Sequence, residues 1–173
     1  MSRFKIGLAA LLLAASAPAG AQTDVPEQAA RGQELFLRTA KPKACANCHA
    51  LAGQGTAVGP DLKMWARFPP RATATAITTQ LTDKVVEVRP KAGAAFPALK
   101  IGESETSLTL FDLAAMSRRE MARAEIGEIA SNTKWKHPPG QEKYTAEQLA
   151  DLVAFIRWAG AKDRKPVAPE DVQ

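Results

Sequence analysis

The pentapeptide Cys45-Ala46-Asn47-Cys48-His49 constrains this chain more than any other stretch. It matches C-x-x-C-H, the attachment pattern of a c-type haem. Two thiols at this spacing can each add to a vinyl group of one porphyrin, and the histidine that follows can ligate the iron through an imidazole nitrogen. The chain contains only these two cysteines, so no thiol is left for a disulfide. A chain with this motif is expected to fold around a covalently held porphyrin.

Two other interpretations of the motif are a redox-active C-x-x-C pair that happens to precede a histidine, and half of a zinc site. No thioredoxin-like βαβ pattern surrounds the motif, as a redox pair of that kind would need. A cysteine-rich zinc site would need a second pair of cysteines, which the sequence lacks. The motif therefore predicts one covalent haem c, attached through Cys45 and Cys48, with His49 as an iron ligand.

Residues 1–21 have the pattern of a secretory signal peptide. Arg3 and Lys5 precede an apolar run, and the segment closes on an A-x-A cleavage pattern that ends at Ala21. The apolar run is too short to span a bilayer. Because haem is attached to such proteins outside the cytoplasm, export and the haem motif agree with each other. We expect cleavage after Ala21 and a periplasmic protein with no stable membrane span; an uncleaved membrane anchor is the alternative.

Residues 22–173 suffice for one compact domain and are too few for two well-packed ones. Loss of the two basic residues of the signal peptide lowers the formal charge from +5 to +3, which is weak support for an acidic partner or a membrane surface. Basic clusters interleaved with aromatic residues are absent, so no nucleic-acid partner is expected. The polar, proline-rich segment 162–173 predicts a disordered tail after a folded domain over 22–161.

Helices are predicted near both ends of this domain. The first spans 26–38, and Glu27 in its first turn suits the positive end of the helix dipole. Gly32 lies inside this helix, where glycine costs roughly 1 kcal/mol relative to alanine, and so indicates close approach by another element. The second helix follows Thr145, which begins a capping box, and ends near Gly160.

With the haem motif between these two helices, the chain resembles a class I c-type cytochrome with one haem over most of its mature length. The resemblance implies a mostly α fold around one covalent haem. It also implies that the first and last helices cross, where a small residue and an aromatic residue of the first meet an aromatic residue of the last. Gly32, Phe36 and Phe155 match this contact, although ordinary helix packing would bury the same residues.

The resemblance implies further roles after the motif. Residues 59–62 match the Gly-Pro-x-Leu segment of these cytochromes, in which the proline carbonyl accepts a hydrogen bond from the iron-binding histidine and fixes its orientation. Pro60 would supply that carbonyl, and Leu62 would pack against the porphyrin face. Trp65 and Arg67 offer the N–H donors that a buried haem propionate needs. A packing tryptophan beside a surface arginine is an equally good interpretation of this pair.

The stretch 84–112 departs from the simplest class I pattern. Residues 85–88, 96–101 and 107–111 are predicted as short strands, with glycines at the turns between them. They predict a small β-hairpin or sheet inserted into the cytochrome fold. Such an insertion also occurs in cytochrome domains associated with periplasmic dehydrogenases, which the chain resembles more loosely. Residues 116–130 are then predicted to form a helix.

The second iron ligand decides what the haem can do. Many class I cytochromes place a methionine followed by proline in a loop shortly before the last helix, and this chain has His137-Pro138 there. His137 is therefore the expected second ligand. Imidazole in place of a thioether predicts a low reduction potential. Met121 or Met116 as the ligand, and an open or water-bound position, remain the alternatives.

Two functions are compatible with these residues. The first is single-electron transfer by a six-coordinate haem, from a periplasmic dehydrogenase to a downstream acceptor such as an oxidase or reductase. The second is a haem enzyme, or a gas- or peroxide-binding cytochrome, whose distal position opens. A catalytic distal pocket would want an acid–base pair beside the iron, and no further histidine is left once His137 is used. We therefore predict electron transfer rather than catalysis.

Overall fold

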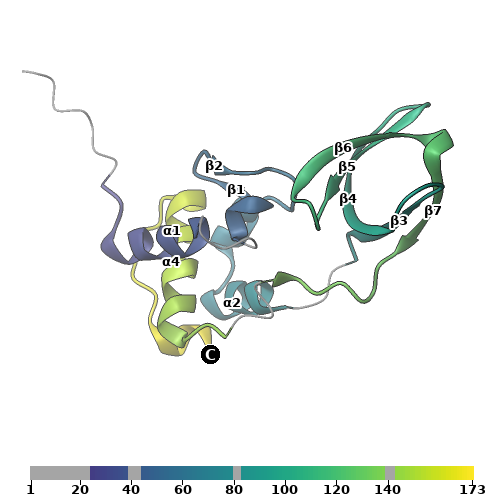
Figure 1. The fold of residues 1–173 in the computed structure, drawn as a ribbon. Helices are drawn as coiled ribbons and strands as arrows, with labels where there is room; N and C mark the ends of the chain where they lie inside the picture. Colours follow the sequence, from purple (N-terminus) through teal and green to yellow (C-terminus); the bar gives the residue numbers. More distant parts are fainter. Residues whose placement is uncertain (1–23, 39–43, 80–82, 139–142) are drawn as a thin grey trace, which may run out of the picture.

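The computed structural model describes residues 24–38, 44–79, 83–138 and 143–173. Of these residues, 38% are helical and 26% lie in strands. Figure 1 shows a helical part and, beside it, a curved β-sheet. The expectation of a mostly α fold is therefore wrong, because the inserted sheet is larger than predicted. The predicted signal peptide lies outside the described residues, and within the described ranges no helix has the length and apolar character needed to cross a membrane.

The helical part carries the ends of the described chain and the C-x-x-C-H motif. Its elements are α1 (Glu27–Leu37), η1 (Cys45–Asn47), β1 (Ala50–Leu51), β2 (Gln54–Gly55), η2 (Leu62–Arg67), α2 (Pro70–Thr78), α4 (Ala146–Ala161) and η4 (Pro169–Val172). The predicted capping box opens α4: the Thr145 hydroxyl accepts from the Gln148 N–H, and the Gln148 side chain accepts from the Thr145 N–H. Helix α4 is buried over most of its length because α1, α2 and η2 pack around it.

The predicted crossing of the first and last helices is present. The rings of Phe36 and Phe155 lie with their centroids 5.5 Å apart, and both side chains are fully buried. A Cβ atom at Gly32 would collide with the backbone carbonyl of Asp151 and with the Cβ of Phe155. The Arg31 guanidinium donates two hydrogen bonds of 3.0 Å to the Asp151 carboxylate at the same crossing. Glycine is required here because the backbones of α1 and α4 lie too close together to leave room for a Cβ atom at residue 32.

Gly32→Ala is expected to destabilise the haem-loaded protein by about 1–3 kcal/mol, the cost of overpacking a well-filled core. The added methyl must push α1 away from α4, which outweighs the gain in helix propensity of about 1 kcal/mol. Denaturant unfolding measures the change. Glu34→Ala, at an exposed position of the same helix, is the control and should stay within about 0.5 kcal/mol of the wild type. Equal stability of all three proteins would contradict the close contact.

The sheet interrupts the helical part between α2 and α4. Its strands are β3 (Val85–Pro90), β4 (Phe96–Glu103), β5 (Ser107–Asp112), β6 (Ser117–Ala122) and β7 (Ile126–Ser131). They are paired antiparallel in the order β6-β5-β4-β3-β7, so β7 returns to lie beside β3. The three predicted strands are present as β3, β4 and β5, and the sheet extends to residue 131 rather than ending at 112.

The helix predicted over residues 116–130 is wrong. This segment instead forms β6, the single 3-10 turn η3 (Arg123–Glu125) and β7. Its methionine, arginine, glutamate and alanine residues favour a helix locally. Pairing of β6 with β5 and of β7 with β3 overrides that preference, because it satisfies the backbone of both strands and completes an apolar inner face.

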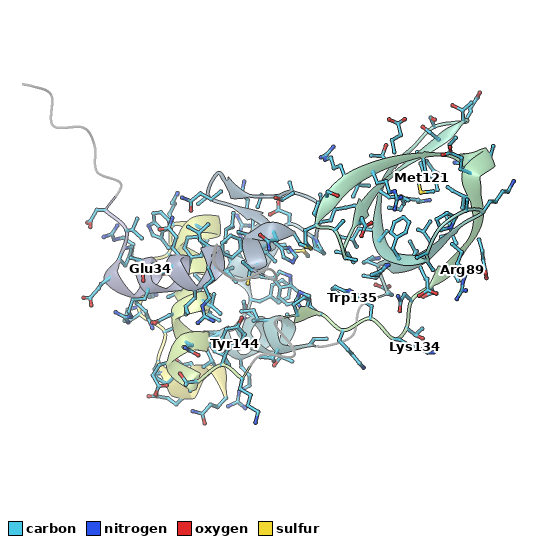
Figure 2. The ribbon with its side chains drawn as sticks, in the orientation of Figure 1. Glu34, Arg89, Met121, Lys134, Trp135 and Tyr144 are labelled. Atoms are coloured by element: carbon cyan, nitrogen blue, oxygen red, sulfur yellow. The ribbon has the colours of Figure 1, made fainter. Side chains whose placement is uncertain are left out.

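The sheet has an apolar core of its own on its concave side. It contains Val88, Phe96, Ala98, Leu108, Leu110 and Met121. Met121 is 6% exposed and lies within the curve of the sheet (Figure 2). This core is separate from the cluster around Phe36 and Phe155 in the helical part. The insertion is therefore a folded unit with its own packing rather than a loose hairpin.

The segment expected to be a disordered tail is ordered. Val167 and Val172 are buried against α2 and α4. The Gln28 side chain of α1 donates to the Val167 carbonyl at 2.8 Å and accepts from the Val167 N–H at 2.9 Å. Two valines in an otherwise polar stretch thus suffice to hold residues 162–173 against the helices, because each fills an apolar site that the helices leave open.

Candidate haem site

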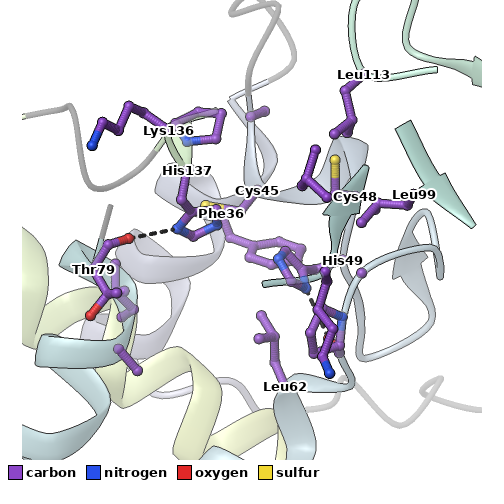
Figure 3. A pocket seen from close by; sticks show the side chains of 18 of the residues that line it. Phe36, Cys45, Cys48, His49, Leu62, Thr79, Leu99, Leu113, Lys136 and His137 are labelled. Atoms are coloured by element: carbon purple, nitrogen blue, oxygen red, sulfur yellow. Dashed lines mark hydrogen bonds between the residues drawn. The ribbon is translucent and has the colours of Figure 1, made fainter. Parts of the chain in front are cut away.

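A cavity of about 510 Å³ lies between the helical part and the sheet (Figure 3). Its lining comes from the helical elements on one side, from β3, β4 and the β5–β6 turn on the other, and from the segment 135–138. The volume falls within the roughly 300–1,000 Å³ typical of pockets for organic ligands and cofactors. The described lining residues are mostly apolar, and none of them is acidic. The lining also includes Lys84 and Lys136, so the cavity suits a large apolar group that carries negative charge.

The C-x-x-C-H motif folds as a tight turn on the wall of this cavity. The N–H groups of Cys48 and His49 both donate to the Cys45 carbonyl, at 3.1 and 2.9 Å. This turn brings the two thiols and the imidazole to the same cavity (Figure 3). Both thiols are partly buried, and burial raises the pKa of Cys48. The attachment residues are therefore gathered as covalent attachment to one porphyrin requires.

The loop that follows the motif fixes the orientation of the His49 imidazole. Its Nδ1–H donates to the Pro60 carbonyl at 2.9 Å, the hydrogen bond expected from the sequence. Gly59 allows the approach, because a Cβ atom there would lie only 2.7 Å from His49 Cε1. Burial lowers the pKa of His49, and the bond to Pro60 opposes that shift. The neutral imidazole is favoured, with Nε2 left as a metal-binding nitrogen.

His137 lies across the cavity from the motif and is held in the same way. Its Nδ1–H donates to the Thr79 carbonyl at 3.2 Å, shown as a dashed line in Figure 3. Thr79 is the C-cap residue that follows α2. Burial, together with the nearby His49, lowers the pKa of His137. This imidazole is therefore also neutral, with Nε2 available to a metal.

The spacing of the two histidines fits one shared metal ion. Their ring centroids are 6.2 Å apart. Imidazoles that bind a metal from opposite sides, each at about 2.0 Å, have their ring centres roughly 6 Å apart. Within the described ranges, no cluster of three or more His, Cys, Asp or Glu could hold a metal by itself. Two opposed imidazoles suit an iron whose remaining ligands come from a porphyrin.

Comparison of the sequence with known families agrees with this geometry. The model of the family described as Cytochrome c matches residues 29–160, which is more than half of the chain. The chain belongs to the cytochrome c family. It is therefore a haem-binding electron-transfer protein whose haem is covalently attached. No curated protein matches this cytochrome significantly.

Only some of the residues predicted to surround the haem line the cavity. Pro60, Leu62 and Trp65 of this cytochrome line the cavity. Arg67 is exposed and does not line it. Arg67 lies at the end of η2, and the 3-10 turn brings Leu62 and Trp65 to the cavity while it leaves Arg67 on the surface. The structure therefore does not support the predicted role of Arg67 at a haem propionate.

The alternative methionine ligands lie in different places. Met121 is packed in the core of the sheet and does not line the cavity, so it is not positioned to bind the iron. Met116 does line the cavity. Met64 is 59% exposed. Among the sulfur ligands weighed from the sequence, only Met116 remains geometrically possible beside His137.

Sequence reasoning missed several residues of the site. Thr79 acts through its backbone carbonyl, so its side-chain identity carries no signal. Trp135 lines the cavity beside His137, with ring centroids 6.3 Å apart, and lies between the helical part and the sheet (Figure 2). Its position two residues before the expected ligand was the available signal. The wall formed by Pro97 and Leu99 of β4 depends on where the sheet lies relative to the motif, which the sequence does not reveal.

Proposed function

We propose that this cytochrome carries single electrons between periplasmic proteins through one haem c whose iron is bound by His49 and His137. The observation that carries the proposal is the matched pair of imidazoles. Each has its Nδ1–H on a backbone carbonyl, and their centroids are 6.2 Å apart across the cavity. When bound, the haem supplies a one-electron iron couple, and Cys45 and Cys48 anchor it through thioether bonds.

The hydrogen bonds from the Nδ1–H groups of His49 and His137 fix the orientation of the two imidazole rings. The Pro60 carbonyl precedes Asp61, whose side chain accepts from the Lys63 N–H and caps η2. The Thr79 carbonyl belongs to the C-cap residue of α2. Because both acceptors belong to fixed backbone, the imidazoles keep one tautomer and one orientation in both oxidation states. Rigid ligands suit a protein that gains and loses electrons without binding a substrate.

The ligand pair and the pocket set the redox character. Two imidazoles favour ferric iron more than an imidazole and a thioether do, which predicts a low reduction potential. Trp65 is the candidate donor to a haem propionate, because it lines the cavity and carries an indole N–H. The absence of Asp and Glu from the described lining gives a bound substrate no carboxylate acid or base. This supports electron transfer rather than catalysis.

The proposed location and partner rest on the sequence. The pattern of residues 1–21 supports export to the periplasm and cleavage after Ala21. A periplasmic dehydrogenase is the proposed electron donor, and an oxidase or reductase the proposed acceptor. N-terminal sequencing of the protein purified from periplasm tests the location, and a chain that begins at Met1 would contradict cleavage.

The reduced protein is expected not to bind carbon monoxide at concentrations that saturate five-coordinate haem proteins. If His49 and His137 both bind the iron, as proposed, the gas would first have to displace one of them. Titration of the ferrous protein, followed by its absorption spectrum, measures this. The His137→Ala variant serves as a positive control with an opened position. Rapid, saturable binding by the wild type would favour a gas-binding or peroxide-binding cytochrome instead.

A further inference from the structure

The turn between β5 and β6 contains a strained residue on the haem cavity. Met116 has a φ of 51°, in the left-handed region that residues with a side chain rarely adopt. Glycine or asparagine is the usual choice at such a turn position. This chain has methionine there, and that methionine lines the cavity. A bulky side chain kept at a conformational cost indicates that the side chain is needed where it lies.

The direction of this turn is fixed by an almost buried carboxylate. Asp112 accepts hydrogen bonds of 2.9 Å from the N–H groups of both Ala114 and Ala115. Its other carboxylate oxygen lies 3.6 Å from the Arg119 guanidinium of β6. The Leu113 N–H donates to the Pro97 carbonyl at 2.9 Å. These bonds hold the turn against β4, so the residues at its tip have a defined position over the cavity.

The sheet thereby adds an apolar wall to a site whose attachment residues all belong to the helical part. Leu99 of β4, together with Leu113 and Met116 of the turn, lines the same cavity as Cys48 and His49. Figure 3 shows Leu99 and Leu113 at this cavity with Cys48. All three wall residues are apolar, and none is fully buried in the sheet core. Their exposed surface is therefore directed to what fills the cavity.

We propose that the β5–β6 turn is a wall of the haem pocket and that Met116 packs against the haem to exclude water from it. The proposal rests on the haem binding proposed above. A bis-imidazole ferric haem carries one more positive charge than the ferrous form, and low polarity disfavours the form with more charge. Exclusion of water by Met116 therefore raises the reduction potential above the value that the same two histidines would give in an open pocket.

The test compares three variants of the haem-loaded protein. Met116→Gly removes the side chain and relieves the left-handed strain. Met116→Leu keeps an apolar side chain and removes the sulfur. Lys162→Gly is the matched control, because Lys162 has a φ of 57° at the end of α4 and does not line the cavity. Reduction potential, absorption spectrum and thermal unfolding are measured for each.

Met116→Gly is expected to lower the equilibrium constant for reduction about 3- to 10-fold, where tenfold corresponds to about 59 mV. Its low-spin spectrum should be retained. Met116→Leu should change the constant less than about 3-fold, and Lys162→Gly should leave it unchanged. If Met116→Gly only alters stability, as Lys162→Gly does, Met116 is a turn residue and the wall proposal is overturned.

Three outcomes separate this proposal from the proposed function. If Met116→Gly and Met116→Leu both abolish the native spectrum, the methionine sulfur binds the iron. The wall proposal and the assignment of His137 would then both be wrong. If no variant and no wild-type preparation holds haem covalently, the proposed function itself fails. Normal haem content with unchanged potentials overturns the wall alone.

Discussion

Cys45→Ala combined with Cys48→Ala is expected to abolish stable haem incorporation and, with it, cooperative folding. The cavity of about 510 Å³ separates the helical part from the sheet wall. At about 24 cal/mol per Å³ of emptied volume, leaving this cavity without haem would lower the free energy of unfolding by up to the order of 10 kcal/mol. That equals the whole stability of a typical domain, roughly 5–15 kcal/mol. A haem in this cavity would therefore contribute a large part of the apolar contacts of the residues from α1, α4 and the sheet that line it.

Two measurements test for the loss of haem attachment and of cooperative folding. Acidified acetone should leave the porphyrin on the wild-type protein and extract it from any residual haem complex of the double variant. Thermal unfolding of haem-free wild-type protein, made in the cytoplasm, should lack a sharp transition. The control is Met64→Ala, since Met64 is exposed and does not line the cavity. Free porphyrin in the wild-type extract, or a sharp transition of haem-free protein near that of the loaded protein, would contradict this prediction.

His137→Ala is expected to open one axial position, and His137→Met to replace nitrogen by sulfur while the haem stays bound. The alanine variant should lose the six-coordinate low-spin spectrum and bind carbon monoxide when reduced. The methionine variant should have a reduction potential higher by roughly 100 mV or more. Such a shift lies within the range of about 0.8 V over which axial ligands set haem potentials. The reason is that a thioether stabilises ferric iron less than an imidazole does.

Trp135→Phe is the matched control for these variants. Trp135 contacts His137 and lines the cavity, but an indole is not an iron ligand. Phenylalanine preserves an apolar ring there, so the low-spin spectrum should persist. Optical and electron paramagnetic resonance spectra of the oxidised proteins report the axial ligands directly. A His137→Ala protein that keeps the native low-spin spectrum would identify Met116 as the ligand, since Met121 is packed inside the sheet.

The features predicted correctly from the sequence are those with a local or strongly patterned cause. The hydrogen bond from His49 to Pro60 and the capping box at Thr145 each depend on residues within a short stretch. The crossing at Gly32 is a long-range contact. It was predictable because a glycine inside a helix needs a reason and the family resemblance supplied the partner residues. The covalent haem follows from spacing alone.

Other features depended on contacts between distant segments. The extent of the sheet was missed because β7 pairs with β3, about forty residues earlier in the chain, and helix-favouring residues conceal both late strands. The ordered end of the chain was missed because Val167 and Val172 are only two apolar residues in a polar stretch. Their burial depends on a site shaped by α2 and α4.

The sequence by itself was enough to predict a covalent haem c, with Cys45 and Cys48 as the attachment residues and His49 as the expected iron ligand, because those roles depend on residue type and spacing. Only the tertiary structure decided which distal residues reach the cavity. It placed His137 at the same cavity as His49, with their ring centroids 6.2 Å apart, buried Met121 in the sheet and left Arg67 on the surface. These positions depend on contacts between residues far apart in the sequence, because apolar surface is buried over the folded chain rather than within any one segment.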